Sequence, residues 1–241
     1  MQKAVIVTLL VLAALFPAFM AAVAIHEGSA MARGIAGMVT GLIVLWIFGA
    51  GTLMWRLRDP IRTAVRRIPL NWRVKFVLFC ILLACAEEAV TVTMTNLAPL
   101  FGARIGEAYI TASTNYLDVI LLHSVIVFIP LFIALMLILA RYDLSPFAVF
   151  LIFGIVGTIC EAIFIAGPSA LFGFPMWSFV YGLMVWLPTY SLPPAETRGT
   201  RPASWYHAIL AVPAIFLLAL PLLLPIVFII TSVLKHPSIH F

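Results

Sequence analysis

The chain has 241 residues, of which 64% are hydrophobic and 10% are charged. A soluble globular domain carries about 25% charged residues, so this composition excludes a protein that folds mainly in water. The net charge of +5 fits a membrane protein whose basic residues gather on the cytoplasmic side. The sequence contains no nucleotide-binding loop of the Walker or Gly-x-Gly-x-x-Gly type. A nucleic-acid partner is therefore not expected.

A helix that crosses a bilayer needs about 20 consecutive apolar residues. The chain contains seven apolar stretches of roughly this kind: 4–25, 35–54, 76–97, 119–140, 146–165, 176–190 and 208–233. They are continuously apolar, which favours helices over the alternating strands of a membrane β-barrel. The sequence predicts an all-α fold, a polytopic transmembrane helical bundle of six to seven spans. We expect one integral membrane domain over residues 1–241, in which the short stretch 176–190 is tilted, extended or partly re-entrant.

The first apolar stretch has two interpretations. Lys3, the apolar core that follows it and the small residues before position 25 also fit a secretory signal peptide, with cleavage after Ala24. The apolar stretch is long for a signal peptide, which favours a retained helix. Cleavage of residues 1–24 would leave six spans and would not change the rest of the topology.

Half of the basic residues lie between the second and third predicted spans. They are Arg56, Arg58, Arg62, Arg66, Arg67, Arg73 and Lys75. The positive-inside rule predicts that residues 55–75 form a basic cytoplasmic loop, which could contain a short interfacial helix and would attract anionic lipid headgroups. Alternation of the spans then places the C-terminus outside.

Few ionisable residues lie inside the predicted spans, and each costs at least about 2.5 kcal/mol to insert. They are Glu87 and Glu88 in the third span, Asp118 and His123 in the fourth, and Glu161 in the fifth. Short loops join neighbouring antiparallel helices, so we expect Glu88, His123 and Glu161 to face one cavity in the outer half of the bilayer. On a regular helix Asp118 points away from His123 and is expected to lie at the interface.

Small and polar residues refine the faces of these helices. Thr91 and Thr95 extend the face of Glu88 along the third span, whereas Gly154 and Gly157 lie on the same side of the fifth span as Glu161. We therefore expect a polar stripe on the third helix and a close helix neighbour beside the fifth.

One imidazole and two carboxylates are the ligand types of catalytic zinc and iron sites. The sequence therefore nominates Glu88, His123 and Glu161 as ligands of a divalent metal such as zinc or iron, with Glu87 as a further catalytic group. This favours an intramembrane enzyme, either metal-dependent or a hydrolase that uses the same groups as acid and base. Two alternatives stay open. One is a proton-coupled carrier of a small solute, and the other is a non-catalytic subunit that packs against partner membrane proteins.

Overall fold

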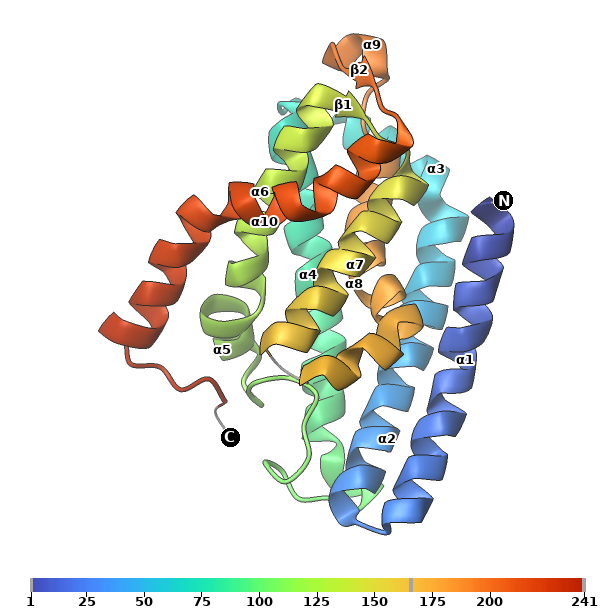
Figure 1. The fold of residues 1–241 in the computed structure, drawn as a ribbon, viewed down its shortest axis with the longest axis vertical. Helices are drawn as coiled ribbons and strands as arrows, with labels where there is room; N and C mark the ends of the chain where they lie inside the picture. Colours follow the sequence, from blue (N-terminus) through green and yellow to red (C-terminus); the bar gives the residue numbers. More distant parts are fainter. Residues whose placement is uncertain (1, 165–166, 240–241) are drawn as a thin grey trace.

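The computed structural model describes residues 2–164 and 167–239. It is a bundle of long helices with a single short pair of strands in its described part (Figure 1). Six helices are long and apolar enough to cross a membrane, and a bent helix pair makes up to seven. The predicted all-α polytopic bundle is therefore confirmed, and the apolar spans indicate an integral, multi-pass membrane protein.

The first two helices form a hairpin. Helix α1 (Gln2–Glu27) ends before Gly28, whose φ of +66° suits a residue without a Cβ. Ser29 then caps α2 (Ala30–Leu42) by accepting a hydrogen bond from the Ala32 backbone N–H at 3.0 Å. Helix α1 packs against α2 and α8. Whether residues 1–24 are cleaved stays a prediction.

The basic segment is more helical than expected. Helix α2 continues through the π-helical segment η1 (Ile43–Ala50) into α3 (Gly51–Arg67), so that one helical run covers 38 residues. Only residues 68–71 separate α3 from α4 (Trp72–Asn96). Most of the segment 55–75 that was expected as a loop is thus an extension of the second span.

The fourth span is broken. After η2 (Ala98–Phe101) and an irregular stretch, the chain forms α5 (Tyr116–Asp118), the π-helical turn η3 (Val119–His123) and α6 (Val125–Arg141). The axis bends by 48° between the two parts. At this break the Ser124 backbone N–H donates to the Val119 carbonyl five residues earlier, at 2.8 Å.

Helices α7 (Pro146–Phe164) and α8 (Phe174–Tyr190) pack against each other, and η4 (Gly167–Gly173) precedes α8. A Cβ added to Gly157 would lie 2.0 Å from the Tyr181 ring, which confirms the close approach expected beside the fifth span. With η4, the short predicted span becomes a run of 24 residues, Gly167–Tyr190. Helix α8 is the most buried span and also contacts α1, α3 and α4.

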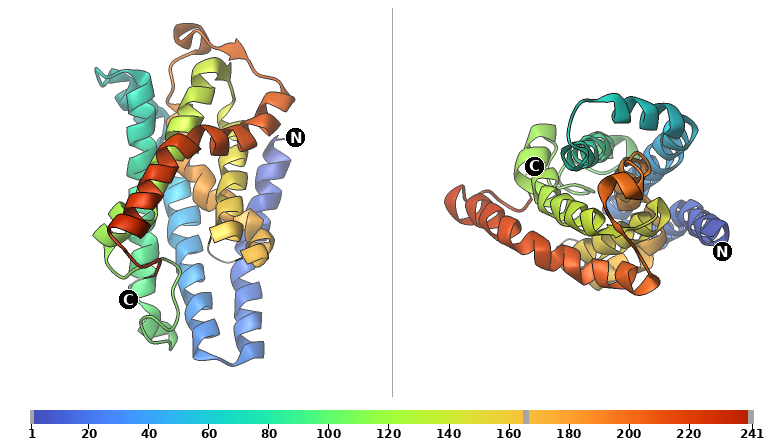
Figure 2. Two further views of the ribbon diagram at one scale, coloured as in Figure 1. Left: turned by 60° about the vertical axis from the view of Figure 1, so that its left-hand side comes forward. Right: turned by 90° about the horizontal axis from the view of Figure 1, so that it is seen from above.

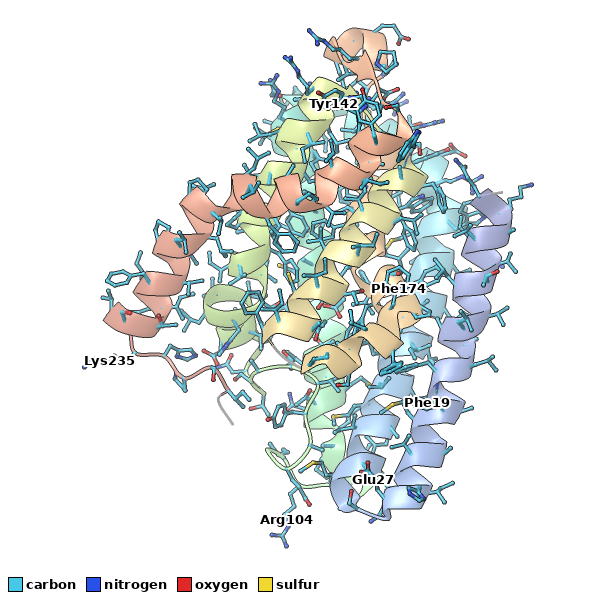
Figure 3. All side chains as sticks on the ribbon, viewed as in Figure 1. Phe19, Glu27, Arg104, Tyr142, Phe174 and Lys235 are labelled. Carbon is cyan, nitrogen blue, oxygen red and sulfur yellow. The ribbon has the colours of Figure 1, made fainter. Side chains whose placement is uncertain are left out.

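The last helix lies on the outside of the bundle. The strands β1 (Tyr142–Asp143) and β2 (Arg201–Pro202) pair in parallel, with α9 (Ala195–Arg198) before β2. Helix α10 (Trp205–Phe228) then crosses α6 and α7 and continues into η5 (Ile229–Val233). Figures 1 and 2 show its C-terminal half diverging from the bundle before the tail turns back. In Figure 3, Tyr142 and Arg104 mark opposite ends of the molecule.

Candidate metal centre and carboxylate cluster

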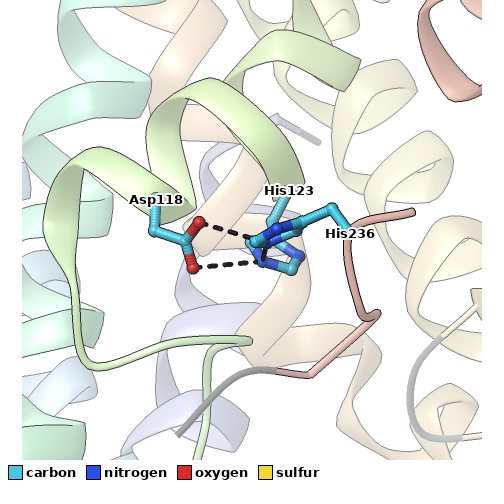
Figure 4. A group of neighbouring side chains, drawn as sticks. All are labelled: Asp118, His123 and His236. Atoms are coloured by element: carbon cyan, nitrogen blue, oxygen red, sulfur yellow. Dashed lines mark hydrogen bonds and ion pairs between the residues drawn. The ribbon is translucent and has the colours of Figure 1, made fainter. Parts of the chain in front are cut away.

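Three side chains from two distant parts of the chain meet beside the broken fourth span. The Nε2 atom of His123 lies 3.4 Å from one carboxylate oxygen of Asp118, and the Nε2 atom of His236 lies 3.1 Å from the other (Figure 4). The two Nε2 atoms are 2.9 Å apart. The side chains are only 9–14% exposed.

These contacts are a hydrogen bond between the two imidazoles and two ion pairs to different oxygens of Asp118, and their lengths are also those between neighbouring ligand atoms of a metal ion. Ligand nitrogen and oxygen atoms lie about 2.0–2.2 Å from zinc, so two ligands of a tetrahedral site are about 3.3 Å apart. The measured separations of 2.9, 3.1 and 3.4 Å lie around this value. Two imidazoles and one carboxylate are also a ligand set found in both zinc and non-haem iron sites.

The π-helical turn explains why Asp118 and His123 meet. In a regular α-helix, five residues advance about 500°, which would leave these two side chains about 140° apart. The wider turn of η3, with its bond from Ser124 back to Val119, brings residues five apart onto the same side. The expectation that Asp118 points away from His123 is therefore wrong, because it assumed a regular helix.

His236 was not predicted as a site residue because it lies outside the predicted spans. It follows η5 in the tail, which turns back from α10 towards α5 (Figures 1 and 4). The sequence held a usable signal, since the predicted topology puts the tail and the start of the fourth span on the same side of the membrane. His240 lies four residues further on, outside the described residues.

Glu88 is the centre of a second, adjacent cluster. Its carboxylate is buried and accepts hydrogen bonds from Thr91 at 2.9 Å, from Thr111 at 3.5 Å and from Ser124. Thr91 and Thr95 are buried as well, so the polar stripe expected along the third span is present in α4. Ser124 directly follows His123 in the chain and donates a hydrogen bond to Glu88, so it connects the two clusters.

Glu161 and Glu87 extend the buried carboxylates towards α8. The Tyr181 hydroxyl donates a hydrogen bond to Glu161. Glu87, Glu88 and Glu161 are all buried. Tyr181 was not anticipated, because sequence position alone does not reveal that α8 packs directly against the glycine side of α7.

The structure thus distributes the predicted site residues over two groups. Within residues 2–164 and 167–239, the group of potential metal-binding side chains whose ligand atoms all lie within 4.8 Å comprises Asp118, His123 and His236. Glu88 and Glu161 lie outside this group and are bonded to hydroxyl groups instead. The structure therefore gives His123 other neighbouring ligands than those nominated from the sequence.

Known proteins do not assign a function to this chain, so a functional proposal rests on the histidine cluster and the buried carboxylates. No family model, curated protein or solved structure matches the chain.

Proposed function

We propose that the chain is a membrane-embedded enzyme that uses a divalent metal ion, zinc or iron, bound by Asp118, His123 and His236. The observation that carries the proposal is the meeting of these three side chains, whose nearest ligand atoms are separated by 2.9–3.4 Å. The Nε2 atoms of the two histidines face each other, and each of them also faces a different carboxylate oxygen of Asp118. A metal ion bound there would activate a water molecule or polarise a substrate oxygen.

Glu88 is the proposed acid–base group, and it is connected to the proposed metal ligands through Ser124. Its carboxylate is buried, and it accepts a hydrogen bond from Ser124, the residue next to His123. A carboxylate in this position can take up a proton from an activated water molecule and return it to a leaving group. Glu87, which precedes Glu88 in sequence, and Glu161 are buried as well. Because these groups lie among apolar helices, the substrate class is a membrane-dissolved molecule with a hydrolysable or oxidisable polar group.

Metal content tests this proposal directly. Protein purified in detergent without chelator is analysed by inductively coupled plasma mass spectrometry, as wild type and as the variants Asp118→Asn, His123→Ala and His236→Ala. The control is His207→Ala, whose side chain contacts Ser204 at the start of α10. We expect about one zinc or iron per chain in wild type and control, and less than a tenth of that in each ligand variant.

His236→Ala is the decisive variant because His236 lies in an irregular tail, where substitution disturbs the helix packing least. A metal-free wild type, or an unchanged metal content in folded His236→Ala protein, would overturn the proposal. Repeating the measurement with His240→Ala determines whether the tail supplies one or two of the ligands.

A proton-coupled carrier is the second candidate, and a different observation favours it. Glu87, Glu88 and Glu161 form a buried set of carboxylates with hydroxyl groups bonded to two of them, the arrangement expected of a proton path. Reconstituted liposomes separate the two functions. A carrier takes up solute in response to a pH gradient and loses this uptake with Glu161→Gln, whereas the metal enzyme shows no such uptake.

A further inference from the structure

An apolar groove runs along the outside of the bundle between α3 and α4. Its volume is about 550 Å³, within the range of about 300–1,000 Å³ typical of ligand sites. Leu57, Leu78 and Leu82 line it and are 41%, 52% and 62% exposed, so the groove opens to the surroundings of the bundle. Both helices belong to segments that are long and apolar enough to cross a membrane, so we expect lipid acyl chains around the apolar part of the groove.

A cationic rim lies at the end of the groove where α3 meets α4. Lys75 lines the groove, and its ammonium group donates to the carbonyls of Val65, Arg66 and Ile68 at 3.1, 3.4 and 3.1 Å. Arg66 follows the groove residue Val65 in sequence and adds a nearby positive charge, and its guanidinium donates to the Ser191 and Leu192 carbonyls. In the described part of the chain neither cation pairs with a carboxylate. Carbonyl groups are neutral, so both positive charges remain uncompensated.

The surrounding segment has the same sign. Residues 55–75 carry seven basic residues and a single acidic one, Asp59. That carboxylate already lies 2.9 Å from Arg62 and 3.9 Å from Arg58. A ligand that fits both parts of the site therefore has a long apolar chain and a negatively charged head at the rim.

We propose that this groove binds one anionic phospholipid, with an acyl chain between α3 and α4 and its phosphate at the Lys75 end. A zwitterionic phospholipid would fill the apolar part equally well, but its head carries no net negative charge. The cationic rim therefore selects the anionic phospholipid, and the apolar groove holds the acyl chain. This site is independent of the proposed metal centre, which lies beside the broken fourth span.

Competition between two lipids tests the proposal. The protein is reconstituted in nanodiscs of equal phosphatidylglycerol and phosphatidylcholine, extracted gently, and its retained lipids are counted by native mass spectrometry. We expect one retained phospholipid per chain, with phosphatidylglycerol enriched at least five-fold. Lys75→Gln should lower the enrichment about five-fold, as expected for losing one cation at a membrane surface. Lys75→Arg, which keeps the charge, should preserve it.

Two further variants separate charge from shape. Leu78→Trp fills the groove and should abolish retention of both lipids, whereas Leu217→Trp, an exposed leucine of α10, should not. Arg141→Gln removes a cation outside the groove and should leave the enrichment unchanged. Equal retention of the two lipids, an unchanged ratio in Lys75→Gln, or lipid retained by Leu78→Trp would overturn the proposal. The proposal would also be overturned if the wild-type protein retained no lipid and formed a dimer that Leu78→Trp converted to a monomer, because a second chain would then occupy the groove.

Discussion

The Ser124 hydroxyl donates a hydrogen bond to the Glu88 carboxylate, and Ser124 is the residue that follows His123. The pair therefore connects the buried carboxylates of α4 to the histidine cluster at the break of the fourth span. Because Ser124 also ends the π-helical turn, the same residue sets the local backbone and the side-chain contact. Mutation can separate these two roles.

Ser124→Ala should leave Glu88 with one hydroxyl donor fewer while keeping the backbone turn. Loss of a buried hydrogen bond to a carboxylate costs about 1–3 kcal/mol, so we expect a lower thermal midpoint with unchanged metal content. The control is Ser145→Ala, which removes only a hydroxyl that accepts from the Ala148 backbone N–H. If Ser124→Ala lost metal as completely as His123→Ala, Ser124 would hold the histidine cluster in place rather than serve Glu88.

Tyr181→Phe should destabilise the contact between α7 and α8. The variant removes the hydroxyl that donates to Glu161, and a buried polar group left without its partner costs about 1–3 kcal/mol. The free energy of unfolding should fall less when Glu161→Gln is already present, because the two residues interact. Tyr190→Phe is the matched control, since Tyr190 donates to the exposed Asp59. Additive effects of Tyr181→Phe and Glu161→Gln would contradict the structural pairing.

Gly157→Ala should also destabilise this contact, through volume rather than polarity. The added Cβ would lie 2.0 Å from the Tyr181 ring, and overpacking of a core costs about 1–3 kcal/mol. Gly49→Ala is a milder comparison, because the nearest atom there lies 3.3 Å away. A thermal midpoint equal to wild type in Gly157→Ala would show that α7 and α8 are less tightly packed than described.

The number and order of the spans could be predicted because continuous apolar stretches have few alternatives in a bilayer. The position of Glu88 on a polar stripe and the glycine face of α7 also followed from helical periodicity. The length of α3 was less predictable. Its basic residues suggested a loop, yet they lie on a helix that continues the second span, and Lys75 donates to the carbonyls at its end.

The histidine cluster could not be derived from periodicity. Its formation requires a π-helical turn that brings Asp118 to His123, and a tail that folds back over residues far away in sequence. Regular helix geometry predicts neither feature. Tyr181 was missed for a related reason, because helix order along the chain does not state which faces of α7 and α8 meet.

The positive-inside prediction gives the C-terminal tail a definite side. Proteoliposomes or spheroplasts carrying one introduced cysteine, with Cys80, Cys85 and Cys160 replaced, can be labelled by a membrane-impermeant maleimide. A cysteine at Ser238 should react from outside, and one at Thr200 should react only after permeabilisation, because alternation of the spans puts them on opposite sides. Labelling of both positions from the same side would require a different number of crossings.

A metal ion shared by Asp118, His123 and His236 would also fix the C-terminal tail. Helix α10 diverges from the bundle before the tail returns (Figure 2), and His236 joins residues 234–239 to the start of the fourth span through its contacts with His123 and Asp118. Removal of the metal by a chelator should therefore speed amide hydrogen exchange in these residues and in residues 116–124, whereas α7 and α8 should stay protected. His236→Ala should reproduce the faster exchange without chelator, and chelation should then have no further effect. If the protein contains metal but chelation leaves the exchange of these residues unchanged, the ion is bound elsewhere. Removing an ion that is bound to His236 would free the tail.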